Sequence, residues 1–203
     1  MKTFREYISE AKSGSLTIFD IDETLFHTTA KIAVLKDGKL VRHLDNQQFN
    51  TYQLKAGETY DFSEFRSAEK FNKESKPINN MMAKAIAILK NSQKNPLSKM
   101  IILTARANFD NKETFLDTFR KYGLDIDKVR VERAGNINDL HGIDTKKFVI
   151  VYNYLKTNQF GKARLFDDSK SNLVAFLKLK KFFPNIEFEA YFVDGKGTVK
   201  ELR

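Results

Sequence analysis

Short apolar runs alternate with longer amphipathic stretches along most of the chain. Strands are predicted at the short runs of residues 16–19, 100–103, 129–131 and 163–166, and at residues 186–193, where apolar and polar residues alternate. Helices are predicted where apolar residues recur every three or four positions, around residues 82–89, 110–122, 144–155 and 169–177. Strands that alternate with helices in this way are typical of a parallel sheet covered on both faces. The pattern therefore predicts an α/β fold.

Residues that commonly cap helices suggest where these helices begin and end. Pro77 suits the first turn of the first helix, because that turn leaves its amide nitrogens unbonded and proline has no amide hydrogen. Asp110 is expected to begin the second helix, with Glu113 placed as in a capping box, and Gly123 is suited to end it. Asp144 is expected to cap the third helix.

A long segment after the first strand, residues 27–76, breaks this rhythm and shows no clear helical period. At roughly fifty residues it is longer than an ordinary connection between two elements. Residues 31–35 and 39–44 can pair as a hairpin about Asp37-Gly38, a dipeptide that favours tight turns.

We expect one core, residues 15–203, into which this segment is inserted as a flap or small cap that lies over the site. The segment is rich in aromatic residues, among them Tyr60, Phe62 and Phe65. These rings could stack on a base or line a pocket, and for at least two of them packing is the expected role.

The composition narrows the classes of protein that fit. The chain has 203 residues and a formal net charge of +9, from 35 Lys and Arg against 26 Asp and Glu. It contains no cysteine, which excludes disulfide bonds, thiolate metal sites and a cysteine nucleophile and fits a reducing cytoplasm. No apolar stretch is long enough to predict a membrane-spanning helix. The positive charge is compatible with an anionic partner such as a nucleic acid, but ordinary solubility accounts for it equally well.

Polar side chains that can carry out chemistry follow several of the predicted strands. In an open parallel sheet, ligands bind at the carboxyl ends of the strands, so these side chains are expected to meet at one edge. They are Asp20, Asp22, Thr104, Arg106, Asp167 and Asp168, together with Lys146 and Lys147 at the start of a helix.

Phosphoryl transfer can use each of these groups. One carboxylate can attack phosphorus to form an aspartyl phosphate, and a second one can protonate the leaving oxygen and then activate water. Acids crowded at strand ends repel one another unless a hard cation lies among them, and Mg²⁺ suits a set of oxygen ligands. A hydroxyl and an ammonium can balance the charge on the transferring group. We therefore expect Mg²⁺ as the cofactor.

Three segments resemble motifs of the haloacid dehalogenase superfamily, in the order in which that family has them. Residues 18–25, Ile-Phe-Asp-Ile-Asp-Glu-Thr-Leu, are similar to the first motif, in which two acids and a threonine follow a buried strand. Residues 101–104 look like the second motif, and residues 164–168 look like the acidic fourth motif. Glu23 is a departure, since glycine is common there. The resemblance covers about residues 15–195 and implies a Rossmann-like sheet with a small cap after the first strand.

The resemblance also implies roles for individual residues. Asp20 matches the nucleophile that becomes phosphorylated. Asp22 matches the general acid and base, a residue that phosphatases have and dehalogenases lack. Thr104 matches the residue that hydrogen-bonds the phosphoryl group. Lys147 or Lys146 matches the third-motif lysine that orients the nucleophile. Lys147 is favoured, because the spacing from Lys147 to the following helix face is more usual for the family.

The same resemblance implies a metal site. Asp168 matches the Mg²⁺ ligand and Asp167 its neighbouring acid, while Asp20 and the backbone carbonyl of Asp22 complete the expected ligands. Arg106, Lys146 and His27 are further candidates for contact with the phosphate, although Arg at a strand end and a histidine in a flap commonly have only structural roles.

The expected function is a Mg²⁺-dependent phosphomonoester hydrolase. The motifs are similar to those of the phosphatase half of polynucleotide kinase-phosphatases, and a basic chain is compatible with a nucleotide or a nucleic-acid end as substrate. The alternative is a virion or nucleic-acid-binding protein that keeps the fold without turnover, which predicts salt-sensitive DNA binding that survives replacement of Asp20. A receiver domain would have a different strand order, and a glycosyltransferase would leave Thr104 and Lys147 unused. The sequence does not indicate the oligomeric state.

Residues 1–14 precede the first strand as a separate leader or helix. Residues 1–12 look like leader segments on proteins of large tailed phages, and Ile8-Ser9-Glu10 is similar to the site that prohead proteases of these phages cut. The resemblance implies a phage-encoded enzyme, located in the cytoplasm of a bacterial host or packaged in the virion. An ordinary amphipathic helix is the alternative.

Overall fold

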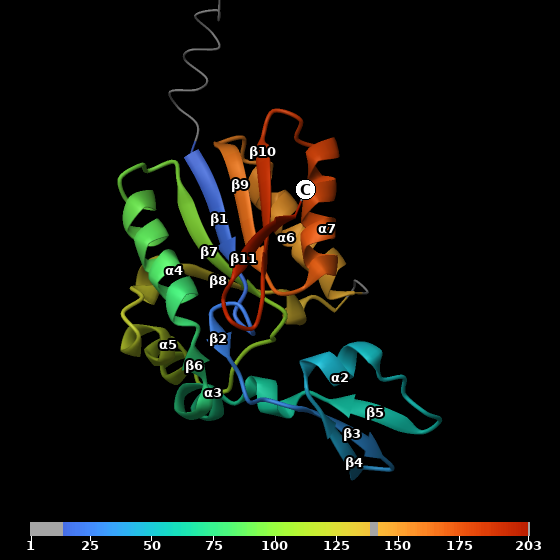
Figure 1. Ribbon diagram of the computed structural model, residues 1–203. Helices are drawn as coiled ribbons and strands as arrows, with labels where there is room; N and C mark the ends of the chain where they lie inside the picture. Colours follow the sequence, from blue (N-terminus) through green and yellow to red (C-terminus); the bar gives the residue numbers. More distant parts are fainter. Residues whose placement is uncertain (1–13, 139–141, 203) are drawn as a thin grey trace, which may run out of the picture.

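A six-stranded sheet forms the centre of the protein (Figure 1). The computed structural model describes residues 14–138 and 142–202. The strands follow the order β11-β10-β9-β1-β7-β8 across the sheet. Their bounds are β1 (Gly14–Phe19), β7 (Lys99–Thr104), β8 (Arg130–Arg133), β9 (Phe160–Asp167), β10 (Glu187–Val193) and β11 (Val199–Leu202). All neighbours pair in parallel except β11, which runs antiparallel to β10. The predicted α/β class with a mostly parallel sheet is confirmed.

Helices cover both faces of this sheet, as the alternation of the strands requires (Figure 1). On one face, α4 (Asn79–Ser92) and α5 (Lys112–Lys121) pack against Phe19, Ile102 and Phe166. On the other face, α6 (Ile143–Leu155) and α7 (Lys170–Leu177) pack against Ile18, Ile101 and Leu165. Adjacent residues of a strand point to opposite faces, so each short apolar run fills two cores.

A row of aromatic rings crosses the first of these cores. The ring of Phe166 stacks on Phe19 at 4.7 Å and on Tyr191 at 4.8 Å between centroids. Burial of an aromatic side chain of this size contributes about 1.5–3 kcal/mol. The row therefore joins β1, β9 and β10, the strands that lead to the acidic end of the sheet.

The helix boundaries differ in part from the predicted ones. Pro77 lies in the short strand β6 (Lys76–Pro77), before α4, instead of in the first turn of that helix. Asn111 caps α5 by accepting a hydrogen bond from the backbone of Thr114 at 3.0 Å, whereas Asp110 accepts one from the backbone of Ala68 at 2.9 Å. Both Asp110 and Asn111 are good capping residues, so the sequence alone could not separate them.

Two other boundaries are informative. Gly142 occupies the capping position of α6, so Asp144 lies inside the first turn and does not cap the helix. Gly123 follows α5 with a φ of +83°, a left-handed conformation that glycine adopts without steric cost, and its predicted role at the end of the helix is confirmed.

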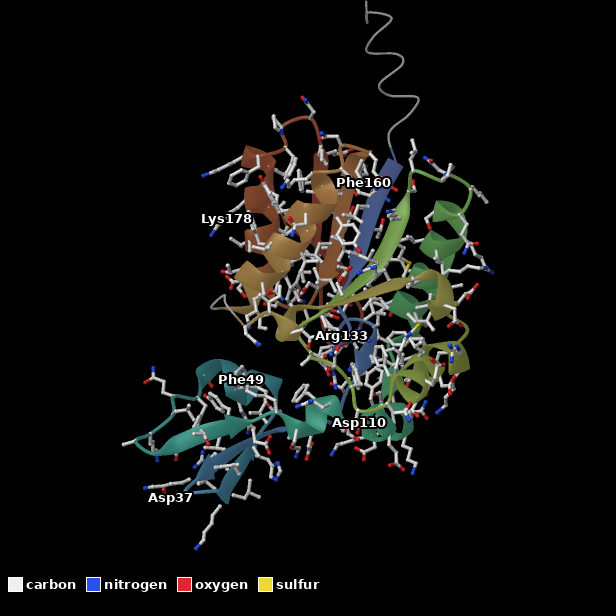
Figure 2. The ribbon with its side chains drawn as sticks, turned by 180° about the vertical axis from the view of Figure 1, so that it is seen from behind. Asp37, Phe49, Asp110, Arg133, Phe160 and Lys178 are labelled. Atoms are coloured by element: carbon white, nitrogen blue, oxygen red, sulfur yellow. The ribbon has the colours of Figure 1, made fainter. Side chains whose placement is uncertain are left out.

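The segment between β1 and α4 contains a small sheet of its own, β3 (Ile32–Lys36), β4 (Lys39–Leu44) and β5 (Glu58–Asp61), in the order β4-β3-β5. The predicted hairpin is present, and Asp37 and Gly38 form its turn with φ values of +51° and +75°. Helix α2 (Asn46–Thr51) packs beside this sheet. In Figure 2, Asp37 lies at the tip of the segment and Phe49 lies on its side nearer the main sheet.

The segment contains helices although its sequence shows no clear helical period. Besides α2 it contains the 3₁₀ turn η1 (Ser63–Arg66) and helix α3 (Ala68–Glu74). Helix α3 packs on α5, where the buried ring of Phe71 contacts Phe115 and Phe119. With six and seven residues, α2 and α3 are too short to display two turns of apolar periodicity.

Most aromatic residues of the segment pack internally. Phe49, Tyr52, Tyr60 and Phe65 surround a small core made by three residues of the hairpin, Ile32, Val34 and Leu44. Phe62 contacts the rings of Phe49, Tyr60 and Phe65 but remains 44% exposed. The expectation that at least two of Tyr60, Phe62 and Phe65 serve packing is confirmed.

The segment leaves and rejoins the core at one place. Strand β2 (Phe26–His27) pairs with β6, so Phe26 faces Pro77 and His27 faces Lys76. The leader predicted at residues 1–14 lies outside the described residues except for Gly14, which begins β1. Of the helices in the described ranges, none has the length and apolar character needed to cross a membrane.

Candidate active site

Strand order brings three polar side chains to neighbouring strand ends. Strand β1 lies between β7 and β9, so Asp20, Thr104 and Asp167 all lie at the carboxyl edge of adjacent parallel strands. The amide of Asp20 donates to the carbonyl of Phe166 at 3.0 Å, which continues the ladder one residue past β1. Figure 1 shows the inserted segment beyond this same end of the sheet.

Lys147 lies between two of these acids. Its ammonium nitrogen is 2.7 Å from Oδ1 of Asp20 and 2.7 Å from Oδ2 of Asp167, and all three side chains are buried. Burial alone would lower the pKa of Lys147, but the two carboxylates outweigh it and raise that pKa above its usual value. Lys146 is half-exposed and has no side-chain partner among the described residues. The structure therefore places Lys147, and not Lys146, among the acids.

The start of α7 holds Asp167 in place from the other side. Oδ1 of Asp167 accepts a hydrogen bond from the backbone of Ser169 at 2.9 Å, and the side-chain amide of Asn172 donates to both oxygens at 3.0 and 3.1 Å. Asn172 is buried, and sequence analysis missed it. The sequence offers one signal for Asn172: its polar side chain stands next to Leu173, on the face of α7 that packs on the sheet.

A third acid completes a group of closely spaced carboxylates. Asp20, Asp167 and Asp168 each offer an oxygen that lies within 4.8 Å of the other two. Burial raises the pKa of Asp168 to about 7, reinforced by the charge of Asp167. Burial also raises the pKa of Asp20 well above its usual range, despite the ammonium of Lys147. Three acids facing one ammonium leave the group short of positive charge, and their oxygens could hold a hard divalent cation.

Asp22 lies apart from this group, in a bidentate ion pair. Nε of Arg106 is 2.9 Å from Oδ2 of Asp22, and Nη2 is 2.6 Å from Oδ1. The hydroxyl of Thr28 donates to Oδ1 at 2.7 Å. Burial alone would raise the pKa of Asp22, but the charge and hydrogen bonds of Arg106, with that of Thr28, hold it below its usual value.

The turn after β1 explains the departure from the first motif. Glu23 has a φ of +54°, a left-handed conformation in which glycine is favoured. The chain turns back here, and the amides of Leu25 and Phe26 both donate to the carbonyl of Ile21, at 2.9 and 3.0 Å. The Glu23 carboxylate accepts a hydrogen bond from the backbone amide of Thr28 at 3.2 Å. This bond stabilises the turn, although a residue other than glycine is strained in the left-handed conformation.

The remaining predicted residues lie nearby with other partners. Nδ1 of His27 is 2.8 Å from the Glu23 carboxylate, and the imidazole is 45% exposed and not part of the acid group. The buried hydroxyl of Thr104 accepts from the backbone of Arg106 at 3.1 Å. Arg106 has its guanidinium on Asp22, so the phosphate contact considered for it would require a change of partner.

Gly135 supports the loop that carries Thr104 and Arg106. It lies in the 3₁₀ turn η3 (Ala134–Asn136), and a Cβ there would come within 2.5 Å of the carbonyl oxygen of Ala105 and 2.7 Å of the amide nitrogen of Ala107. Backbone atoms cannot swing aside as a flexible side chain can. No sequence pattern indicates this close approach, because nothing marks Gly135 as different from other glycines.

We expect Gly135→Ala to lower the free energy of unfolding by about 1–3 kcal/mol, the usual cost of overpacking. Urea denaturation measures the change. Gly195→Ala is the matched control, since a Cβ at that exposed glycine meets no atom within 4 Å. Equal stability of the two variants would show that η3 can retreat from the loop at no cost.

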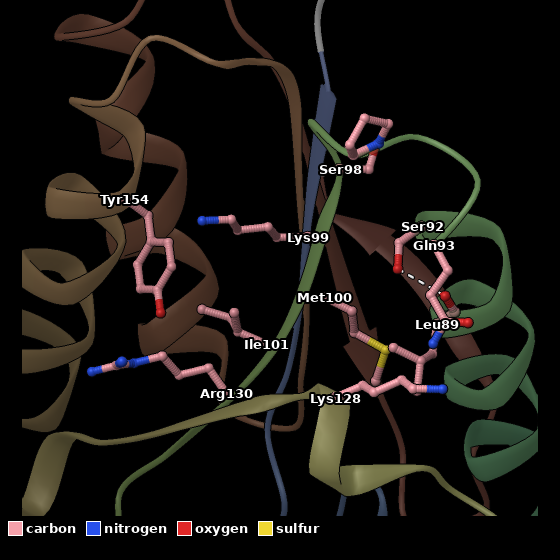
Figure 3. A pocket seen from close by; sticks show the side chains of 11 residues that line it. Leu89, Ser92, Gln93, Ser98, Lys99, Met100, Ile101, Lys128, Arg130 and Tyr154 are labelled. Carbon is pink, nitrogen blue, oxygen red and sulfur yellow. Dashed lines mark hydrogen bonds between the residues drawn. The ribbon is translucent and has the colours of Figure 1, made fainter.

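A separate pocket of about 350 Å³ lies at the other end of the sheet (Figure 3). The pocket lies beside the first residues of β7, where this strand does not yet pair with β8. The pairing of the two strands begins at Ile101 and Arg130. In Figure 3, Lys99 and Ile101 lie on the side of Tyr154, and Met100 lies on the side of Leu89. None of the acids, Thr104 or Lys147 lines this pocket. It is therefore distinct from the site at the carboxyl edge.

Comparison with known proteins gives a family for the chain. The sequence has no match among curated proteins. A family model described as "Protein of unknown function (DUF2608)" matches residues 1–163, so it includes β1, β7, β8 and α6 and stops within β9, before Asp167. Because this match spans most of its length, the chain belongs to the family described as "Protein of unknown function (DUF2608)".

Proposed function

We propose that the protein is a Mg²⁺-dependent phosphomonoester hydrolase of the haloacid dehalogenase type, which acts through an aspartyl phosphate on Asp20. The observation that carries this proposal is the ammonium of Lys147, 2.7 Å from both Asp20 and Asp167 at the ends of adjacent parallel strands. The three motifs that resemble that superfamily thus supply side chains to one edge of the sheet.

Asp20 is the proposed nucleophile because one of its oxygens is free to react. Oδ1 accepts the hydrogen bond from Lys147, while Oδ2 accepts none from the described residues. Lys147 holds the carboxylate in one orientation, and Asp167, fixed by Ser169 and Asn172, holds Lys147. A carboxylate oriented in this way can bond to phosphorus as the bond to the leaving oxygen breaks.

The second group needed is an acid and base, and we propose Asp22. Arg106 holds the pKa of Asp22 low, so Asp22 would carry a proton only after it turns away from that guanidinium, and it would then give this proton to the leaving oxygen as Asp20 becomes phosphorylated. The resulting carboxylate would take a proton from the water that attacks the phosphorus of aspartyl phosphate, which releases inorganic phosphate and restores Asp20. The Thr104 hydroxyl, at the end of the strand beside β1, would donate to a phosphoryl oxygen.

The donor set fits Mg²⁺. The group offers carboxylate oxygens from Asp20, Asp167 and Asp168, without nitrogen or sulfur ligands. Burial, reinforced by the charges of neighbouring acids, raises the pKa values of Asp20 and Asp168, and a divalent cation would offset the repulsion among these acids. When bound, Mg²⁺ would offset the charge of these carboxylates and of the substrate phosphate.

The proposal predicts that Mg²⁺ both binds at the acids and enables turnover. Phosphate release from p-nitrophenyl phosphate is expected with Mg²⁺ and not with EDTA. Mg²⁺ is also expected to raise the melting temperature, since a ligand at 100 times its Kd adds about 2.7 kcal/mol to stability. Asp168→Asn should reduce both effects, and Asp37→Asn, the same change in the exposed turn at the tip of the insertion, should change neither.

Turnover that persists in EDTA would overturn the metal requirement. A protein that releases no phosphate from any monoester with Mg²⁺ present would overturn the proposed reaction.

For the substrate we propose a nucleotide or the phosphorylated end of a nucleic acid. Three cations near the strand ends form no salt bridge among the described residues: Arg133 at the end of β8, Lys146 in α6 and Lys170 at the start of α7. Arg133 pairs with Thr104 in the sheet register. Such cations favour a substrate with more negative charge than one phosphate. Comparison of nucleoside monophosphates with 3′- and 5′-phosphorylated oligonucleotides tests the choice.

A further inference from the structure

Arg106 lies where three parts of the protein meet. It belongs to the loop after β7, it binds Asp22 in the turn after β1, and it contacts the inserted segment through Phe65. Its side chain is 2% exposed, so each of these contacts is shielded from water. A charge buried to this degree must be fully paired, because a guanidinium without partners would cost several kcal/mol.

On the side of Asp22, the contact fixes the orientation of the carboxylate. The planar guanidinium donates from Nε and Nη2 to the two different oxygens of Asp22, at 2.9 and 2.6 Å. This fork allows a single orientation of the carboxylate relative to Arg106. Since Thr28 donates to Oδ1 as well, both oxygens of Asp22 already accept hydrogen bonds. Asp22 can turn toward another group only if Arg106 shifts.

On the side of the insertion, the same guanidinium holds η1. Nη1 donates to the carbonyl of Phe65 at 2.9 Å, and the ring of Phe65 lies 4.7 Å from the guanidinium carbon. Phe71 and Phe109 also lie against the guanidinium, at 5.1 and 5.4 Å. Phe65 packs in turn on the small core of the insertion. The position of Arg106 is therefore tied to the position of η1.

Further bonds join this part of the insertion to the same loop. The amide of Asp110 donates to the carbonyl of Arg66 at 2.9 Å, and Oδ1 of Asp110 accepts from the backbone of Ala68. Residues 65–68 and residues 106–110 therefore move together or separate together. A change in the angle of the insertion would act on Asp22 through this contact.

We infer that Arg106 is a positioning residue through which the insertion controls the orientation of Asp22. The inference rests on the proposed function, in which Asp22 serves as acid and base. When η1 is seated as described, Arg106 holds Asp22 by both oxygens. A substrate that shifts η1 frees one oxygen of Asp22 from Arg106, and that oxygen then turns toward the leaving oxygen of the substrate. Arg106 thus acts on the reaction through Asp22 and the seating of Phe65, and not by contact with the phosphate.

The test compares two substrates that differ in their need for an acid. An alkyl phosphate has a poor leaving group and depends on proton donation, whereas p-nitrophenyl phosphate depends on it little. We expect Arg106→Lys, which keeps the charge and loses the fork, to lower the single-turnover rate at which the alkyl phosphate phosphorylates Asp20, a step in which Asp22 acts only as an acid, by roughly 10- to 100-fold. The loss on p-nitrophenyl phosphate should be at least several times smaller, and KM should stay close to the wild-type value.

Phe65→Leu is the second variant, and it leaves Arg106 and the Phe65 carbonyl in place. It should reproduce the same difference between substrates with a smaller loss in the single-turnover rate. Arg66→Lys is the matched control, because Arg66 is exposed in the same turn and no side-chain contact ties it to the loop. It should match the wild type on both substrates. Urea denaturation of each variant identifies any that fails to fold.

The outcomes separate the inference from the function on which it rests. A rise in KM at constant kcat in Arg106→Lys would show a phosphate contact and overturn the inference. Equal losses on both substrates, or a Phe65→Leu protein that behaves as wild type, would also overturn it while leaving the hydrolase intact. A wild-type protein that turns over neither substrate would reject the proposed hydrolase and, with it, the role of Arg106.

Discussion

Asp20→Asn is expected to abolish phosphate release while the protein stays folded. The substitution keeps the shape of the side chain but removes the nucleophilic oxygen, and loss of a nucleophile typically lowers kcat by on the order of 10⁴-fold or more. Stability should not fall with it. Burial raises the pKa of Asp20, which means that its charged form is disfavoured in the folded protein. A neutral side chain there should leave the melting temperature unchanged or raise it.

The two measurements are made on the same preparation. Phosphate release is followed with Mg²⁺ present, and the wild-type protein, quenched in acid during turnover, is digested to find a phosphoryl group on the peptide that contains Asp20. Asp37→Asn serves as the control for the chemical change. An active Asp20→Asn protein, or a phosphoryl group on another peptide, would remove Asp20 from the reaction.

Lys147→Met is expected to cost about 3–5 kcal/mol of unfolding free energy, the usual effect of removing one partner from a buried ion pair. The change leaves the buried carboxylates of Asp20 and Asp167 facing each other without the ammonium between them. Turnover should fall as well, because Asp20 loses the bond that orients it. Lys146→Met, the same change one residue earlier, should alter stability by no more than about 0.5 kcal/mol, since Lys146 has no side-chain partner among the described residues.

A double variant distinguishes lost charge from lost packing. If the stranded carboxylate causes the instability, Asp20→Asn should raise the stability of Lys147→Met by more than it raises that of the wild type. Additive effects of the two substitutions in urea denaturation would instead point to a packing defect around the new methionine. Equal stability of Lys146→Met and Lys147→Met would contradict the ion pairs as described.

The main sheet could be predicted because its strands are buried on both faces. Residues 100–103 are apolar throughout and residues 16–19 are apolar except for the buried Thr17, so this pattern is visible without any knowledge of neighbouring strands. Strand β11 was missed, since Val199 and Leu202 are separated by charged residues at the edge of the sheet. Helix α3 was missed as well, because its burial depends on one aromatic residue, Phe71, that meets α5 from a distant part of the chain.

The same distinction applies to the candidate site: residues placed by regular elements could be predicted, and residues placed by tertiary packing could not. Asp20 follows β1 and Asp167 ends β9, so the rule that strand ends converge was enough to bring these two together, and Lys147 lies in the first turns of α6. The pairing of Asp22 with Arg106 spans 84 residues and depends on how Phe65 packs, which no local pattern contains. Asn172 was missed for a related reason, because an amide in a helix signals a ligand only after its neighbour Asp167 is placed.

The paired strands β2 and β6 have a consequence for how such a protein can diverge. Because they hold the two ends of the insertion together, the excursion between them closes a loop whose entropic cost grows slowly, by about 0.6 kcal/mol for each doubling in length. Residues 32–61 can therefore be lengthened, shortened or exchanged with little effect on the stability of the main sheet. A change there that shifts Phe65 would nevertheless reach Asp22 through Arg106, so the shape of the insertion and the proposed chemistry would have to diverge together.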